Sequence, residues 1–126
     1  DGIENLLDTL QKQGHKLYVA TSKPKEYSVR ILDKFGLLKY FEYVSGSSMD
    51  EKDSDKATII KNALNVSLAD KKDVLMIGDR CFDIKGAKTN GVDSLAVLYG
   101  YGSREEITDS APEYIAETVN DIFNYV

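Results

Sequence analysis

The stretch that most constrains the fold is VLMIGDRCFDIKGAKTNG (residues 74–91), in which an apolar run leads directly into Gly78 and Asp79. A short apolar run that is bounded by a turn signal is typical of a buried strand, which we place at residues 73–77. Residues 82–89 follow the turn as a helix, and the Asn-Gly pair behind them is a typical helix stop. A strand, a tight turn and a helix in this order predict one unit of a parallel α/β sheet.

The same alternation of strand and helix signals runs along the whole chain. Apolar residues three and four positions apart indicate helices, and short runs of β-forming residues indicate strands. The predicted helices are residues 3–13, 24–35, 55–64, 82–89, 104–109 and 119–126, and the predicted strands are residues 16–21, 41–45, 73–77, 94–99 and 114–116. We therefore expect a single α/β domain over residues 1–126, with a three-layer, Rossmann-like parallel sheet that has helices on both faces.

The composition excludes several classes of protein. The net charge is −5, from 16 basic and 21 acidic residues, so the chain lacks the basic footprint of a nucleic-acid-binding protein. No apolar run reaches the roughly 18 residues that a membrane span needs. Cys81 is the one cysteine, which excludes an internal disulfide and suits a reducing, cytoplasmic compartment.

Polar residues follow the strand predicted at residues 16–21, and they suit an anion. Ligands of open parallel sheets bind beyond the carboxyl ends of the strands, where Thr21 and Ser22 lie here. Their hydroxyls, the free backbone N–H groups and the start of the next helix together favour a phosphate. The simpler alternative is that Thr21 or Ser22 only caps that helix.

Two carboxylates follow the strand at residues 73–77. If the helix starts near Asp79, then Asp79 and Asp83 lie on one face, one turn apart. Such a pair of hard oxygen ligands suits Mg²⁺ that keeps several of its waters. In the alternative interpretation, Asp79 caps the helix and Asp83 is an exposed partner of Arg80 or Lys85.

Lys56 is the third candidate residue. It lies at the start of a predicted helix, where a positive charge is mildly unfavourable, so it has no local reason to be there. A phosphate or carboxylate nearby would supply one, whereas the alternative is an ordinary solvated lysine. A hydroxyl-lined anion site, a lysine and a carboxylate pair together suit metal-assisted phosphoryl transfer.

The segments KLYVATSKP, SDKATII and DVLMIGDRCFDIKGAKTNGVDSLAVLYGYGSREEI carry a resemblance to the haloacid dehalogenase superfamily, in particular to its phosphoglycolate phosphatase-like members. The resemblance implies that Thr21 binds the phosphoryl oxygens, with Ser22 beside it. It implies that Lys56 neutralises the phosphate and that Asp79 holds Mg²⁺ with support from Asp83. The implied substrate is a small phosphorylated metabolite, either phosphoglycolate-like or a nucleoside monophosphate.

Two parts of the family pattern are absent. The family attacks phosphate with the first Asp of a DxDx(T/V) motif on an N-terminal strand, and neither that motif nor the cap segment occurs in these 126 residues. We therefore expect an incomplete core, a piece of a longer protein that is inactive by itself. The missing strand normally lies between those that carry Thr21 and Asp79. We expect these two strands to pair directly or another segment to fill the gap, with self-association or segment exchange between chains as one outcome.

Two other functions remain open at this point. One is a non-catalytic α/β domain that binds phosphate or a partner. The other is a phosphoacceptor receiver domain, but a receiver needs its acids after the first strand and Lys-Pro after the last, and here the order is reversed. The segments 46–55 and 100–106 are predicted to border the active site.

Overall fold

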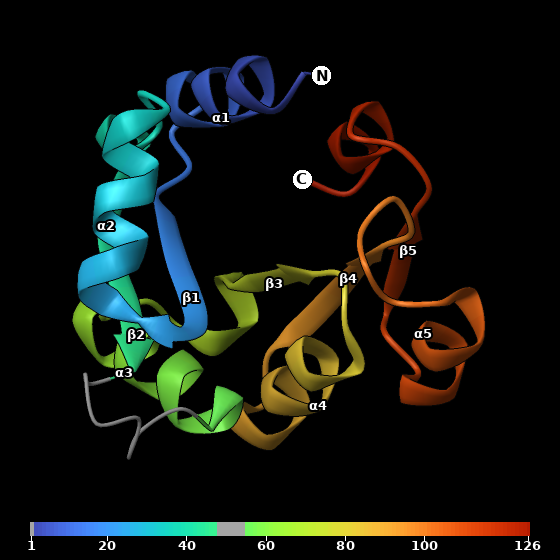
Figure 1. Cartoon of the computed structure of the whole chain (residues 1–126). Coiled ribbons are helices and arrows are strands. Elements are labelled where there is room, and N and C mark those ends of the chain that lie inside the picture. The colour runs from blue at the N-terminus through green and yellow to red at the C-terminus, as the bar shows by residue number, and fades with distance from the viewer. Residues whose placement is uncertain (1, 48–54) are drawn as a thin grey trace. The chain divides into compact units, whose positions relative to one another are not determined.

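The computed structural model describes residues 2–47 and 55–126 (Figure 1). These residues form two compact units, Gly2–Leu68 and Ala69–Val126. Most of the predicted loop at residues 46–55 lies outside the described residues. No helix in the described ranges is long and apolar enough to cross a membrane.

The unit Gly2–Leu68 is built around a two-stranded parallel sheet. Its elements are α1 (Ile3–Lys12), β1 (Leu17–Pro24), α2 (Lys25–Lys34), a short 3₁₀ turn (Leu38–Tyr40), β2 (Phe41–Ser47) and α3 (Lys56–Ser67). Both α2 and α3 pack against the sheet, and the buried residues of this unit include Val44 of β2 and Ile59 and Ile60 of α3. The Ser45 hydroxyl, also buried, donates a hydrogen bond of 2.7 Å to the carbonyl oxygen of Ile59 and so joins the strand to the helix.

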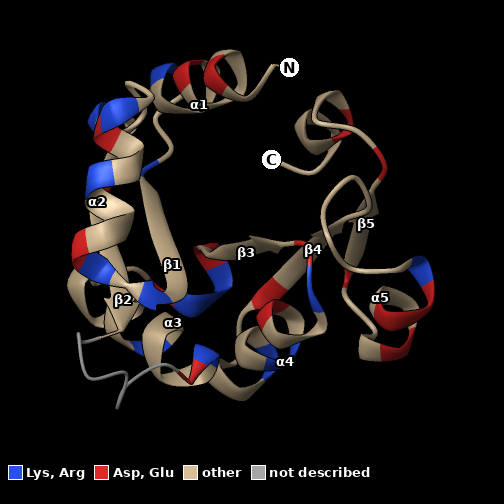
Figure 2. Ribbon diagram, in the orientation of Figure 1, with Lys and Arg blue, Asp and Glu red and all other residues tan. Residues whose placement is uncertain are grey.

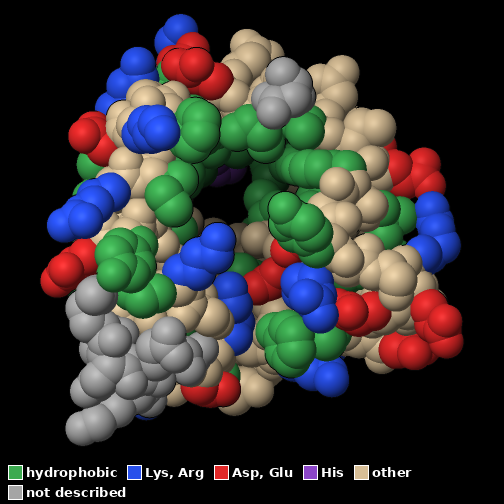
Figure 3. Space-filling view, in the orientation of Figure 1, with side chains coloured by type: hydrophobic (Ala, Val, Ile, Leu, Met, Phe, Trp, Pro, Cys, Tyr) green, Lys and Arg blue, Asp and Glu red, His purple; other side chains and the backbone are tan. Residues whose placement is uncertain are grey.

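Helix α2 has an apolar stripe that the described part of the chain does not cover. Tyr27, Ile31 and Phe35 recur every four residues, and their exposed fractions are 48%, 47% and 67%. Figure 3 shows hydrophobic side chains at the surface over this helix, and Figure 2 shows both signs of charge along it. The helix itself is confirmed, whereas periodicity alone does not show whether its apolar face is buried.

The unit Ala69–Val126 has a three-stranded parallel sheet in the order β3-β4-β5. Its elements are a 3₁₀ turn (Lys71–Asp73), β3 (Leu75–Gly78), α4 (Cys81–Asn90), β4 (Asp93–Val97), α5 (Arg104–Ser110), β5 (Tyr114–Ala116) and a second 3₁₀ turn (Asn120–Asn124). The central strand β4 is the most deeply buried of the three. Ile84 of α4, Ala96 of β4 and Ile107 of α5 form a fully buried cluster that holds the helices on the sheet.

The predicted α/β class with parallel strands is confirmed, and three details differ. The last predicted helix is only a 3₁₀ turn, and Pro24 ends β1 and precedes α2 instead of lying in its first turn. In the described residues, β1 pairs with β2 and β3 with β4, so the direct pairing of β1 with β3, one of the two alternatives expected from the sequence, is not found. Each is an edge strand of its own sheet, which explains why the apolar strand β3 is only half-buried, with Ile77 36% exposed.

The carboxylate of Glu113 supplies a pH-dependent contribution to stability in this unit. Its Oε1 accepts hydrogen bonds from the backbone N–H of Ser94 (2.8 Å) and from the Ser94 hydroxyl (3.2 Å). The hydrogen bond from the Ser94 N–H is the largest cause that lowers the pKa of Glu113 below its ordinary value of 4.5, and the charge of Lys88 also lowers it. Because the folded-state pKa is lowered, this stabilisation is present above pH 4.5 and is lost as the pH falls through the folded-state value.

We therefore expect the parent chain to be more stable than the Glu113→Gln variant at pH 7, and the difference to shrink as the pH falls from about 5 to 3. Urea unfolding at a series of pH values measures it. A difference that stays constant over this range would show that the Glu113 charge has no part in stability.

Candidate active site

Thr21 and Ser22 lie in the last four residues of β1, just past Ala20, where its regular pairing with β2 ends. Thr21 Oγ1 accepts a hydrogen bond of 3.2 Å from the backbone N–H of Lys23, while the Ser22 side chain is exposed. Helix α2 starts at Lys25 with Pro24 in the N-cap position and has no side-chain cap. The capping interpretation of Thr21 and Ser22 is therefore wrong, because the helix begins beyond the reach of either hydroxyl.

Lys56 is the first residue of α3, and its side chain points back to the end of β1. Asp55 caps the helix by accepting the N–H of Thr58 (3.2 Å), so the chain turns into α3 directly before Lys56. The half-buried Lys56 Nζ donates a hydrogen bond of 3.1 Å to the carbonyl oxygen of Ala20, the residue that precedes Thr21. The structure thus brings Lys56 to the strand end that carries Thr21, and the interpretation of Lys56 as an ordinary solvated lysine is wrong.

The two acids of the second unit meet at the turn between β3 and α4. Asp79 lies in the turn, before the helix starts at Cys81, and Asp83 is the third residue of the helix. Asp83 is 7% exposed, and its Oδ2 accepts the backbone N–H groups of Asp79 (3.1 Å) and Arg80 (3.3 Å). The prediction that both acids share one helical face is wrong, since Asp83 folds back to cap the helix start. The alternative of an exposed Asp83 is wrong for the same reason.

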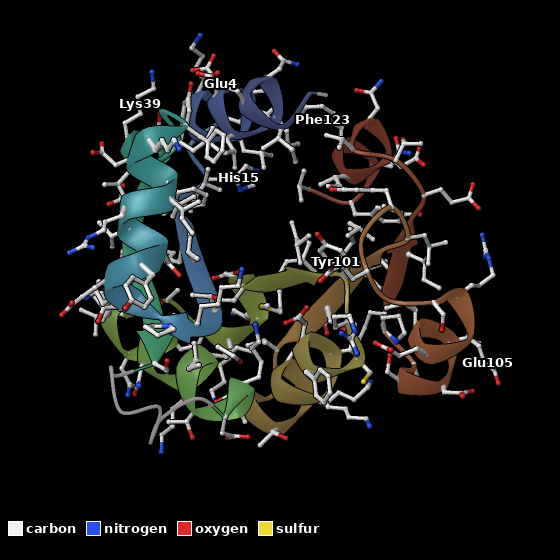
Figure 4. All side chains as sticks on the ribbon, in the orientation of Figure 1. Glu4, His15, Lys39, Tyr101, Glu105 and Phe123 are labelled. Carbon is white, nitrogen blue, oxygen red and sulfur yellow. The ribbon has the colours of Figure 1, made fainter. Side chains whose placement is uncertain are left out.

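The loop between β4 and α5 closes on Asp79. The backbone N–H of Tyr101 donates a hydrogen bond of 3.0 Å to Asp79 Oδ2, while the Tyr101 side chain is 94% exposed (Figure 4). A side chain on Gly100 would overlap the Asp79 carboxylate, so the loop backbone approaches it directly. Burial and, second, the charge of Asp79 raise the pKa of Tyr99. The segment predicted to border the site at residues 100–106 therefore lies against Asp79.

Glu106 of α5 also reaches the turn between β3 and α4. Its Oε2 accepts hydrogen bonds from Arg80 Nε and from the backbone N–H of Cys81, both 2.8 Å. The bond from Arg80, followed by the bond from Cys81, lowers the pKa of Glu106, and Glu106 in turn raises the pKa of Arg80. Sequence reasoning did not select Glu106, and its place in the segment 100–106 was the one signal that pointed to it.

The donor set at this turn fits a magnesium ion that keeps most of its waters. The described residues include no group of three or more His, Cys, Asp or Glu that could hold a metal. Mg²⁺ is commonly bound through one or two carboxylates together with water and substrate phosphate, so a larger group is not needed. A carboxylate has two oxygens with about four acceptor positions, so the bond from Tyr101 to Asp79 Oδ2 leaves Asp79 able to bind a cation.

Comparison with known proteins gives a consistent picture. A family model described as haloacid dehalogenase-like hydrolase matches residues 1–97. A 5'-nucleotidase of Pseudomonas aeruginosa is 39% identical over 114 residues, which are 90% of this chain and 52% of that protein. A phosphoglycolate phosphatase of Nitrosococcus oceani is 31% identical over 98% of this chain and 55% of its own. The chain thus spans about half the length of the curated relatives it matches.

Solved structures match over nearly the whole chain. The crystal structure of a predicted phosphatase from Clostridium acetobutylicum superposes with a TM-score of 0.96 at 42% identity. The match covers 98% of this chain and 57% of that one.

Proposed function

Because the chain belongs to the haloacid dehalogenase-like hydrolase family, we propose that it is the core part of a Mg²⁺-dependent phosphatase acting on a small phosphorylated metabolite. The observation that carries this proposal is the hydrogen bond from Lys56 Nζ to Ala20 O, which holds a cation at the strand end that presents Thr21. A lysine and a hydroxyl at the carboxyl end of a parallel strand are suited to a phosphoryl group.

On the phosphate side, Thr21, Ser22 and Lys56 are the proposed ligands. The Thr21 hydroxyl accepts a bond from the Lys23 N–H, and its own proton remains to be donated to a phosphoryl oxygen. The bond from the Lys56 ammonium to Ala20 O fixes the position of its charge beside Thr21. We assign Lys56 to neutralise the phosphoryl oxygens and the attacking carboxylate.

On the metal side, Asp79 is the proposed Mg²⁺ ligand, directly or through water, and Asp83 supports it. Asp83 binds the N–H groups of Asp79 and Arg80 and so fixes the direction in which Asp79 leaves the strand. The bound ion would neutralise charge on the transferred phosphoryl group. The residues of the chain would bind and orient the ion, and the Tyr101 N–H holds the Asp79 carboxylate in place.

The proposed reaction passes through an aspartyl-phosphate, and the attacking Asp is not among these residues. No DxDx(T/V) motif occurs in the 126 residues, so we expect the isolated chain to be inactive.

The names of the relatives favour phosphoglycolate-like or nucleoside monophosphate substrates. Among the described residues, β1 and β3 each have one edge without a partner strand, which supports self-association or segment exchange as a further proposal. The single cysteine supports a cytoplasmic location.

Phosphate release from a panel of small phosphomonoesters tests the proposal, with the longest natural form of the protein assayed with Mg²⁺ and with EDTA. We expect turnover that needs Mg²⁺ and that is lost in Lys56→Met, while Lys61→Met, an exposed lysine of the same helix, leaves it intact. The isolated chain should neither release phosphate nor take up a hydroxylamine-labile phosphoryl group. Binding of phosphate without turnover in the longest form would favour the non-catalytic alternative.

A further inference from the structure

Glu106 joins α5 to the turn that presents Asp79. One of its oxygens, Oε2, accepts bonds from both the Arg80 side chain and the Cys81 backbone, the two residues that follow Asp79. The Glu106 side chain is 25% exposed, so it is less accessible to water than the 42% exposed Arg80. Both bonds go to an ionised acceptor and are shorter than 3 Å, which is typical of strong, charge-assisted bonds.

The loop that precedes α5 holds Asp79 from the same direction. Tyr101 N–H binds the Asp79 carboxylate, and a side chain on Gly102 would overlap the Asp79 carbonyl oxygen. Ser103 caps α5 by accepting the N–H of Glu106 (3.0 Å), which links this loop to the position of the Glu106 carboxylate. Residues 101–106 therefore contact Asp79 and both residues after it.

A purely structural account would treat Glu106 as the partner of a surface ion pair. An exposed ion pair by itself contributes little to stability, because water screens it. The bond from the Cys81 N–H does not fit that account, because it anchors the first residue of α4 to α5 through the same oxygen. Glu106 thus holds the two residues that follow Asp79, and this limits the directions in which the Asp79 carboxylate can point.

We propose that Glu106 is a positioning residue, which holds the turn at Arg80 and Cys81 so that the Asp79 carboxylate keeps the direction needed to bind Mg²⁺. This inference rests on the proposed function, in which Asp79 is the cation ligand. Groups that orient metal ligands without touching the metal typically change affinity 10- to 100-fold when they are removed. We expect a loss of about that size for Glu106→Ala and a smaller one for Glu106→Gln, which keeps an acceptor for the Cys81 N–H.

Glu105 is the matched control. It is the adjacent residue of the same helix, has the same charge and is exposed, and Figure 4 shows its side chain pointing outward from α5. The ¹⁵N-labelled chain and its Glu106→Ala, Glu106→Gln and Glu105→Ala variants are titrated with MgCl₂ while the Asp79 amide signal is followed. Hydrogen exchange of the Tyr101 amide, measured without metal, reports the bond to Asp79 independently of any ion.

The expected result is Mg²⁺ binding that is about 10- to 100-fold weaker in Glu106→Ala and faster exchange at Tyr101, with neither change in Glu105→Ala. Parent-like Mg²⁺ affinity and parent-like Tyr101 exchange in a folded Glu106→Ala chain would overturn the positioning role. If Glu106→Ala does not fold, the same criteria apply to Glu106→Gln. If the parent chain shows no Mg²⁺ response while Tyr101 exchange still depends on Glu106, the proposed cation site fails and the positioning of Asp79 stands.

Discussion

Replacing Gly78 with alanine is expected to lower the free energy of unfolding of the unit Ala69–Val126 by about 3–5 kcal/mol. A Cβ at this position would overlap the Cβ, Cγ and Oδ2 atoms of Asp83. Asp83 is buried, so it has no room to move aside without releasing the N–H groups of Asp79 and Arg80. The cost therefore combines overpacking with the loss of hydrogen bonds to a charged acceptor.

Urea unfolding monitored by circular dichroism measures this loss, and Gly91→Ala provides the control. Gly91 has a φ of 74° and only the Lys71 side chain nearby, at 3.8 Å, so an alanine there meets backbone strain without overlap. We expect that variant to lose about 1 kcal/mol. Equal losses for the two variants would show that the contact between Gly78 and Asp83 does not matter.

The second large effect is expected in the longest natural form of the protein, where Asp79→Asn should reduce kcat by about 100- to 1000-fold. The substitution removes the negative charge that we propose for Mg²⁺ binding. The amide oxygen of asparagine can still accept the Tyr101 N–H, so the loop at residues 100–106 should keep its place. The loss would then reflect the chemistry of the site and not the unfolding of its surroundings.

Initial rates of phosphate release over a range of Mg²⁺ concentrations measure this effect. Asp73→Asn serves as the control, because Asp73 is an exposed acid in the 3₁₀ turn before β3. We expect the control to match the parent at every Mg²⁺ concentration. Parent-like activity of Asp79→Asn at saturating Mg²⁺ would rule out Asp79 as the cation ligand.

The elements that the sequence predicted well are those with local signals. Strand β5 occurs at Tyr114–Ala116 as predicted, and α4 ends where the Asn-Gly pair indicated, with Gly91 in the left-handed conformation. In both places the backbone conformation depends on neighbouring residues, namely β-forming side chains in one case and a glycine after the helix in the other. Such signals can be read without knowledge of the rest of the fold.

The errors concern contacts between residues that are distant in the sequence or roles that spacing cannot distinguish. Asp83 lies four positions after Asp79, a spacing that fits two carboxylates on one helical face and also fits an Asp83 that caps the helix. Only the residue at which α4 starts decides between these two roles. The contact of Glu106 with Arg80 and Cys81 spans 25 or more residues and depends on how α5 packs. The sequence reasoning selected Thr21 and Lys56 from their places at element ends, and the roles proposed for them await experiment.

The parallel ladders also have a consequence for the order in which the chain can fold. Among the described residues, every ladder joins strands that start about twenty residues apart, and none crosses from one unit into the other. Loops of this length close quickly and at modest entropic cost. Because Gly2–Leu68 contains both strands of the β1–β2 ladder, a ribosome that has released these residues has already supplied both partners of that ladder. The pairing of β1 with β2 can therefore form during synthesis, before the turn that carries Asp79 has been made.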